Sequence, residues 1–299
     1  MTSAMSVAPQ LSSQGNVDAS VVIPTRDRPL ELVRCLRALG QQQTAKRFEV
    51  IVVDDGSVPP LQAADLGLAP IARVIESGGV GPARARNRGI DAARAPYVLF
   101  TDDDTAPSPP WVESACAFLE AHPEHVGVEG PTVSPPFDPL YERSLVNRRP
   151  GAYWTCNVAY RRDVLDALGG FAEIFPAPHG EDLDLAFRAL RQGKIGFSAA
   201  MEVTHYPASV SVRETIRRTR WVSSDLILYR RHPDRFPRQL PARIEPPVAM
   251  LRYLKGMLRR ERRAMVGTPR RLARFLVWSV GQLAVAAWVP LRAGGRWER

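Results

Sequence analysis

The chain has 299 residues, of which 45% are hydrophobic and 24% are charged, and its formal net charge is +9. These values are typical of a folded protein with a sizeable core and argue against disorder outside its ends. The cysteines Cys35, Cys116 and Cys156 are odd in number and lack metal-ligand spacing, so they indicate reduced thiols and no disulfide framework.

The N-terminal segment does not look like an export signal. Its first 20 residues lack a basic region followed by an apolar one, so we expect a flexible tail over residues 1–18. The folded part that follows is therefore expected to stay in the cytoplasm.

Three apolar runs, each ending in a polar loop, alternate with helical patterns. The first run is "ASVVIPT". The segment "LELVRCLRALGQQ" follows it and has apolar residues at helical spacing, Leu30, Val33, Leu36 and Leu39. The second, "FEVIVVDDGS", stops at Asp54 and Asp55, and a helix start follows at Gly81 and Pro82. The third is "YVLFTDDD".

Continuous apolar strands that alternate with helices predict an α/β fold. We expect a Rossmann-type, mainly parallel sheet with helices on both faces. Ligands bind beyond the carboxyl ends of such strands, so the three polar loops should meet at one edge.

The acidic cluster of Asp102, Asp103 and Asp104 lies at the end of the third run. Three neighbouring carboxylates repel one another, and a divalent cation such as Mg²⁺ or Mn²⁺ relieves that repulsion. In an extended segment Asp102 and Asp104 would point the same way. The alternative is a turn or helix-cap cluster without a ligand.

A basic loop complements this acidic one. Arg84, Arg86 and Arg88 flank a helix start, where guanidinium and backbone N–H groups suit a diphosphate. Asp27 and the Asp54–Asp55 pair add acceptors for a base or ribose, although each alone is better explained as a turn or cap residue. Together the two loops indicate a metal-bound nucleotide.

The sequence resembles the inverting family 2 glycosyltransferases of the GT-A fold over residues 19–210. The likeness rests on an ordered set of motifs: "SVVIPTRDRPLELVRCLRAL", "FEVIVVDDGS", "GPARARNRGI", "YVLFTDDDT", "NVAYRRDVLDALGGF" and "GEDLDLAFRALRQG". Each motif alone is weak, whereas the ordered set is specific. The family often has an aromatic residue followed by Asn where this chain has Arg26 and Asp27.

The resemblance implies a donor site at the strand ends. Pro24, Thr25 and Asp55 would line the base pocket, and Asp102 and Asp104 would form the DxD motif. The full set implied to contact the nucleotide-sugar donor is Pro24, Thr25, Arg26, Asp55, Arg86, Asn87, Asp102 and Asp103. The nucleotide is left open among UDP, GDP and dTDP.

A second carboxylate pair begins an amphipathic helix in "HGEDLDLAFRALRQG". The apolar face is predicted to hold Leu183, Ala186, Phe187 and Leu190. The helix dipole favours Glu181 and Asp182 at the first turn, so both could be capping residues. Inverting sugar transfer needs a general base, and resemblance to the family's ED motif implies Asp182 as base with Glu181 as its acceptor-binding neighbour.

His205 in "AAMEVTHYP" is the expected partner of Asp104 in a site for Mn²⁺ or Mg²⁺, because some members of the family complete the site with a histidine from this region. A lone histidine is otherwise most often structural. Asn157 and Gly170 match the family's acceptor-side pattern, in which a glycine allows close backbone approach beside the sugar. Trp154 is expected to stack on a sugar face, although a place in the core explains it equally well.

Residues 211–299 form an expected basic helical extension. The uncharged stretch Phe275–Leu291 follows a segment dense in arginine and is marginally long for a bilayer span. We expect it to lie in or on a membrane, and the alternative is packing on the catalytic domain or in a homodimer. The enzyme would then sit at the inner face of the cell membrane, where a glycan or lipid-linked acceptor fits.

The sequence therefore favours a metal-dependent inverting glycosyltransferase. A nucleotidyltransferase is the first alternative, but it would need a glycine-rich phosphate loop after the first strand, and "VVIPTRDRPLE" has none. A noncatalytic nucleotide- or membrane-binding scaffold is the second. Nucleic-acid binding is supported by charge alone.

Overall fold

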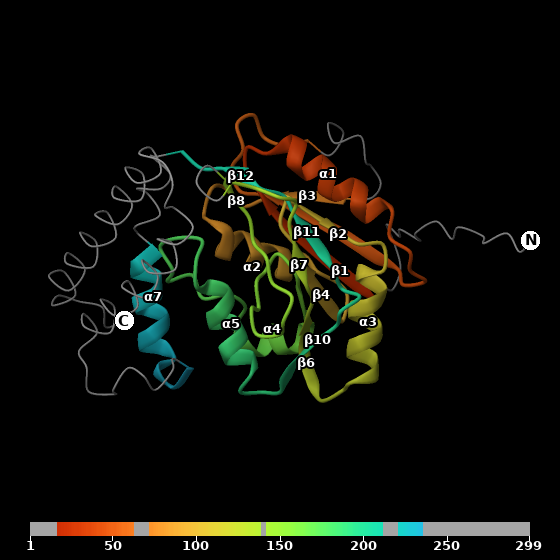
Figure 1. Cartoon of the computed structure of the whole chain (residues 1–299), viewed down its shortest axis with the longest axis vertical. Coiled ribbons are helices and arrows are strands. Elements are labelled where there is room, and N and C mark those ends of the chain that lie inside the picture. The colour runs from red at the N-terminus through yellow and green to blue at the C-terminus, as the bar shows by residue number, and fades with distance from the viewer. Residues whose placement is uncertain (1–16, 63–71, 139–141, 212–220, 236–299) are drawn as a thin grey trace, which may run out of the picture. The chain divides into compact units, whose positions relative to one another are not determined.

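The computed structural model describes residues 17–62, 72–138, 142–211 and 221–235 (Figure 1). It divides into two compact units. Unit 1 comprises residues 1–135, 144–173 and 181–207, and unit 2 comprises residues 136–143, 174–180 and 208–299. Most of the expected tail over residues 1–18, and the apolar stretch Phe275–Leu291, lie outside the described residues.

Unit 1 is built on a seven-stranded sheet with the order β10-β6-β9-β4-β1-β2-β3. Its strands are β1 (Ala19–Thr25), β2 (Phe48–Asp54), β3 (Ala72–Glu76), β4 (Tyr97–Phe100), β6 (His125–Glu129), β9 (Val158–Arg161) and β10 (Lys194–Phe197). All neighbouring pairs are parallel except those of β9, which runs antiparallel to β4 and β6. The expected mainly parallel sheet is confirmed.

Helices cover both faces of this sheet, as expected (Figure 1). One face packs on α1 (Pro29–Gly40) and α3 (Trp111–Ala121), and the other on α2 (Pro82–Ala92), α4 (Arg162–Leu168) and α5 (Glu181–Ala189). Alternate residues of β1 divide between the two cores, since Val21 and Ile23 enter the first and Val22 enters the second. Both faces of the strand are apolar for this reason.

The helix faces agree only in part with the expected ones, with Leu36, Leu39 and Ala186 buried as expected. Leu30 of α1 is 82% exposed, and the buried stripe is Leu32, Cys35, Leu36 and Leu39. In α5, Leu185 and Ala189 are buried with Ala186, whereas Leu183, Phe187 and Leu190 are half-buried. Two overlapping apolar stripes fit each helix at 3.6 residues per turn, and the stripe that faces the sheet is selected by packing.

A second, three-stranded sheet lies in unit 1. It contains β5 (Thr105–Pro107), β11 (Val203–His205) and β7 (Thr132–Val133) in the order β5-β11-β7. In the antiparallel pairing of β5 and β11, His205 is opposite Thr105. This register brings a histidine from late in the chain beside the loop that follows β4.

Unit 2 contains the described remainder of the chain. Its elements are β8 (Glu142–Arg143), β12 (Ala208–Ser209), α7 (Trp221–Arg231) and the 3₁₀ helix η3 (Pro233–Arg235). The His179 ring stacks on Trp221 and its Nε2 lies 2.8 Å from Oδ1 of Asp225. Within the described ranges, no helix is both long and apolar enough to span a bilayer.

Gly89 allows α2 to approach β1 closely. An added Cβ would lie 2.3 Å from Cγ1 of Val22. Alanine is favoured over glycine inside a helix by about 1 kcal/mol, but overpacking a buried contact costs about 1–3 kcal/mol. We expect Gly89→Ala to lower the free energy of unfolding by about 1–2 kcal/mol in urea denaturation. Because Val22→Ala removes the clashing methyl group, the double variant should lose less free energy of unfolding than the sum of the two single losses. Simply additive losses would contradict this packing.

Candidate active site

The polar loops after β1, β2 and β4 meet at one edge of the sheet, as expected. The backbone N–H of Asp55 donates to the carbonyl of Thr25 over 2.8 Å, and that of Asp27 donates to Oγ of Ser57 over 2.9 Å. The Thr25 hydroxyl donates to Oδ2 of Asp103 over 2.8 Å. Strand ends that are far apart in sequence therefore form one continuous rim.

The Asp103 side chain points into this rim. It is 4% exposed, and it accepts hydrogen bonds from Thr25 and from Nη1 of Arg28 (3.2 Å). Burial raises the pKa of its carboxyl to about 7, although the Arg28 guanidinium acts in the opposite direction. The Asp103 carboxylate therefore ties the β1 and β4 loops together, and its expected contact with the donor stays a prediction.

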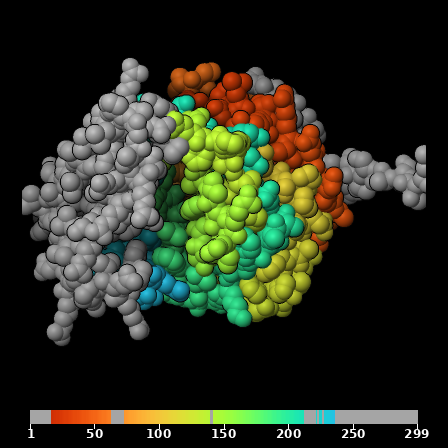
Figure 2. All heavy atoms as spheres, viewed as in Figure 1, coloured from red at the N-terminus to blue at the C-terminus, as the bar shows by residue number. Residues whose placement is uncertain are grey.

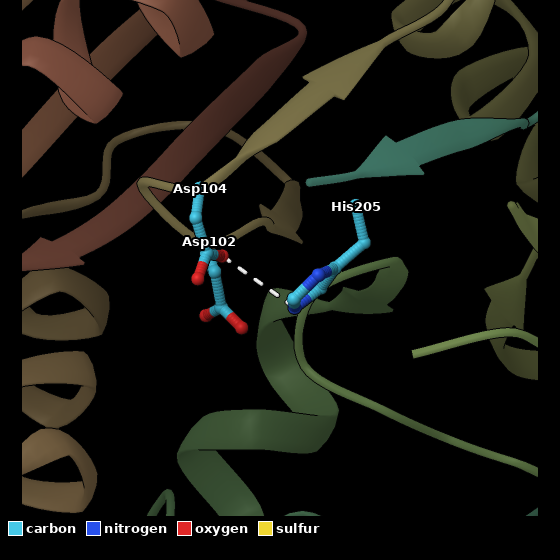
Figure 3. A group of neighbouring side chains, drawn as sticks. All are labelled: Asp102, Asp104 and His205. Atoms are coloured by element: carbon cyan, nitrogen blue, oxygen red, sulfur yellow. Dashed lines mark ion pairs between the residues drawn. The ribbon is translucent and has the colours of Figure 1, made fainter. Parts of the chain in front are cut away.

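Asp102, Asp104 and His205 form a cluster whose side chains point toward one another (Figure 3). One ligand atom from each lies within 4.8 Å of the other two, and Nε2 of His205 is 3.5 Å from Oδ1 of Asp104. The reason differs from the expected one, since Asp103 and Asp104 lie in a turn and not in an extended segment. Two carboxylates and one imidazole fit a divalent cation such as Mn²⁺.

Two arginines offset the charge of the aspartates. Nη1 of Arg28 donates to Oδ2 of Asp104 over 3.1 Å as well as to Asp103. Nη2 of Arg86 donates to Oδ1 of Asp102 over 3.0 Å. Burial raises the pKa of the Asp104 carboxyl, while the charge of the neighbouring Arg28 opposes that rise. At Asp104 the oxygen that Arg28 leaves, Oδ1, is the one that lies 3.5 Å from His205.

Arg86 also joins this cluster to the start of α5. Its Nη1 donates to Oε1 of Glu181 over 3.0 Å, and the two side chains are 7% and 5% exposed. The neighbouring Asp182 is half-buried, and its Oδ1 accepts the backbone N–H of Leu183. The two carboxylate motifs, about eighty residues apart in the sequence, therefore share one buried guanidinium.

Two asparagines expected at the ligands are used inside the protein. Nδ2 of Asn87 donates to the carbonyl of Phe171 and to Glu173, and its Oδ1 accepts the N–H of Phe171. Asn157 is 2% exposed and bonds to the Trp111 indole and to two backbone carbonyls. Both carboxamides therefore have partners inside the protein, and their expected contacts with donor and acceptor stay predictions.

Asp55 and Gly170 also have partners within the protein. The Asp55 carboxylate accepts from the Ser77 hydroxyl and from the N–H groups of Val80 and Gly81, which shapes the loop before α2. Gly170 has φ +68°, and an added Cβ would lie 2.4 Å from Oδ1 of Asn87. The close approach at Gly170 is thus to Asn87, whereas the sequence interpretation assigned it to a sugar.

The remaining expected residues lie at the surface or half-buried. Pro24 is half-buried in β1, Trp154 is half-buried, and Arg26 is exposed with its Nε 3.7 Å from Oδ2 of Asp27. Arg26 and Trp154 are therefore at least partly exposed to solvent, whereas Asn157 is buried.

Several residues of the site were missed. Arg28 was the easiest to find, because it directly follows Asp27 at the end of a strand. Arg34, whose guanidinium lies 3.7 Å from the centroid of the Tyr206 ring, and Ser144, which contacts His205, had no signal in the sequence.

The three-layer fold and the carboxylates at the carboxyl edge of its sheet define a GT-A-type architecture. Residues 20–169 match the model "Glycosyl transferase family 2", and residues 97–294 match "Glycosyl transferase family group 2". The chain belongs to glycosyltransferase family 2.

Two individual relatives share about 30% of their residues with this chain over the matched regions. The pre-mycofactocin glycosyltransferase of Mycobacterium tuberculosis (strain CDC 1551 / Oshkosh) is 30% identical over 248 residues, covering 75% of this chain and 50% of the relative. The validoxylamine A glucosyltransferase of Streptomyces hygroscopicus subsp. limoneus is 28% identical over 231 residues, covering 62% and 51%. The chain thus spans about half the length of these relatives.

Among solved structures, S. aureus TarS 1-349 has the same fold. It matches with a TM-score of 0.53 at 18% identity, covering 94% of this chain and 93% of TarS 1-349. TarS has also been solved in complex with UDP and with UDP-GlcNAc.

Burial distinguishes two arginines of the same helix. Removing one partner of a buried ion pair costs about 3–5 kcal/mol, whereas an exposed pair contributes less than about 1 kcal/mol. We expect Arg86→Met to lower the free energy of unfolding by about 3–5 kcal/mol. Arg84→Met is the matched control, because Arg84 pairs with Glu173 at the surface, 53% and 42% exposed. Equal losses for the two variants in urea denaturation would contradict the buried link.

Proposed function

We propose that the chain is a metal-dependent inverting glycosyltransferase that moves a sugar from a nucleotide-diphosphate sugar to an acceptor hydroxyl. Its place would be the synthesis of cell-envelope glycan or polysaccharide. The observation that carries this proposal is Arg86, which bonds both Asp102 of the cation cluster and Glu181 at the start of α5. Donor-binding and proton-accepting groups are thereby held in one site, as a direct displacement requires.

The cation would be Mn²⁺ or Mg²⁺, held by Asp104 and His205 together with Asp102. The support is the donor set, in which carboxylate oxygens and a ring nitrogen lie within 4.8 Å of one another. Bound there, the cation would offset the negative charge that develops on the departing diphosphate. We propose that the backbone N–H groups at the N-terminal turn of α2 and the guanidinium of Arg26 lie nearest the donor.

The proposed base is Asp182. The carboxylate takes the proton of the acceptor hydroxyl while the acceptor oxygen forms a bond to the anomeric carbon. The bond from that carbon to the diphosphate breaks on the opposite face, and its electron pair leaves with the nucleoside diphosphate. Glu181, fixed by Arg86, holds the first turn of α5 in place beside Asp182.

UDP is the nucleotide we propose first, because TarS, which shares the fold, was solved with UDP and UDP-GlcNAc. The acceptor is proposed to be a glycan or a lipid-linked sugar, bound near Trp154.

The donor proposal is tested by isothermal titration of the full chain with UDP, GDP and dTDP. We expect one nucleotide, UDP, to bind with Mn²⁺ present and to lose binding when the metal is chelated. The absence of binding to all three nucleotides, and to their intact nucleotide sugars, would reject the transferase and favour a noncatalytic scaffold.

The division of roles is tested with two variants. We expect Asp104→Ala to abolish metal-dependent UDP binding, and Asp182→Asn to keep it while slowing donor hydrolysis by water about 10²- to 10⁴-fold. Asp163→Asn is the control for Asp182→Asn, because Asp163 also lies in the first turn of a helix and accepts the next backbone N–H. Loss of UDP binding in both Asp104→Ala and Asp182→Asn would refute the division.

We also propose attachment to the inner face of the cell membrane, supported by the sequence of residues 213–291. Arginines are dense before the apolar stretch Phe275–Leu291, and anionic lipid attracts such a segment. The full chain should float with phosphatidylglycerol vesicles in a density gradient and float less with phosphatidylcholine vesicles. A chain that stays at the bottom with both would exclude attachment.

A further inference from the structure

The His205 imidazole is held on the side opposite the carboxylates. Its Nδ1 lies 3.1 Å from the Ser144 hydroxyl oxygen and 3.2 Å from the carbonyl oxygen of Tyr206. The same hydroxyl donates to the backbone carbonyl of His205 over 2.8 Å. One serine side chain therefore contacts both the ring and the backbone of His205.

Counting donors and acceptors fixes where the ring proton sits. A hydroxyl has one hydrogen, and that of Ser144 is directed at the His205 carbonyl, so toward Nδ1 its oxygen can only accept. The carbonyl of Tyr206 can only accept as well. Both neighbours of Nδ1 require an Nδ1–H, and the neutral ring then carries its lone pair on Nε2.

The other side of the ring agrees with this assignment. Nε2 lies 3.5 Å from Oδ1 of Asp104, which is longer than an N–H···O hydrogen bond of about 2.7–3.2 Å. The nitrogen lone pair and two carboxylates face a common point, an arrangement that a cation stabilises.

We propose that Ser144 is a positioning residue that holds His205 as the Nδ1–H tautomer and so presents Nε2 to the cation. The inference rests on the proposed metal site, and Ser144 itself touches neither metal nor donor. Groups that orient a metal-binding histidine in this way contribute about 10- to 100-fold to metal affinity.

Ser144 reaches His205 because the segment after β6 folds beside β11. β7 pairs in parallel with β11, and Thr132 and Asn147 exchange backbone hydrogen bonds of 2.7 and 2.8 Å. On the face shown in Figure 2, yellow-green atoms of the 130s and 140s lie beside teal atoms of residues near 200.

The backbone beyond His205 is fixed as well. The N–H of Tyr206 donates to the carbonyl of Asp104 over 2.9 Å, and the guanidinium of Arg34 lies 3.7 Å from the centroid of the Tyr206 ring. Ser144 therefore acts on a ring whose backbone position is already set, and its removal should change the ring orientation more than the fold.

The first test is ¹⁵N NMR of the metal-free full chain, which distinguishes a protonated from an unprotonated ring nitrogen. We expect Nε2 of His205 to be unprotonated. The second is titration with Mn²⁺ alone, in which Ser144→Ala should raise the Kd about tenfold and Ser144→Thr should restore it. Ser134→Ala is the matched control, because that hydroxyl bonds a local carbonyl in the same segment, and it should leave the Kd unchanged.

A double-mutant cycle separates positioning from a general structural effect. In a His205→Ala background, Ser144→Ala should cause no further loss of Mn²⁺ affinity. An equal loss in both backgrounds, a wild-type Kd for Ser144→Ala, or an Nε2–H in the wild-type chain would overturn the proposal. If Mn²⁺ and UDP bind but Ser144→Ala has no effect, this inference alone fails; if Ser144→Ala weakens Mn²⁺ binding but no nucleotide binds, the proposed function alone fails.

Discussion

The structure of the site depends on keeping three consecutive carboxylates together at the end of β4. Two like charges 4 Å apart repel by about 4 kcal/mol in surroundings of intermediate polarity, so the cluster needs cations close by. Arg28 at the start of α1 and Arg86 in α2 supply them, each at 3.0–3.2 Å from its aspartates. The first two helices are therefore anchored to the β4 loop by charge as well as by apolar packing. Because the compensation comes from both sides, the oxygens of Asp102 and Asp104 that face His205 remain directed at one point.

Arg86 extends this constraint to the second carboxylate motif. A planar guanidinium can donate to two acids at fixed angles, which an ammonium group cannot do. Its two terminal nitrogens bond Asp102 and Glu181 separately, so the first turn of α5 is fixed relative to the turn after β4. A displacement of Asp102 or Glu181 would therefore move the guanidinium and change the position of the other carboxylate. The geometry of the proposed base is in this way coupled to that of the proposed cation site.

Much of the fold could be predicted from the sequence, because buried parallel strands are continuous apolar runs and their polar ends mark the rim. The edge at which Thr25, Asp55 and Asp103 meet follows from that pattern alone. Side-chain directions did not follow. Leu30 and Leu32 fit helical spacing equally well, and only the packing of α1 selects Leu32. Likewise, nothing near Asn157 in the sequence indicates that Pro131 and Met201 supply its acceptors.

The same limit applies to the site residues that the motifs indicated. Motifs mark positions where a particular side chain is needed, and that need arises equally from a ligand and from an internal partner. Hydrogen-bond counting helps to separate the two cases. The carboxamides of Asn87 and Asn157 bond to backbone and side-chain groups inside the protein, whereas Asp102 and Asp104 each offer an oxygen to the cluster. Asn87 nevertheless belongs to the working site, because it ties α2, which carries Arg86, to the segment at Phe171. Its influence on chemistry would then pass through the position of Arg86 as well.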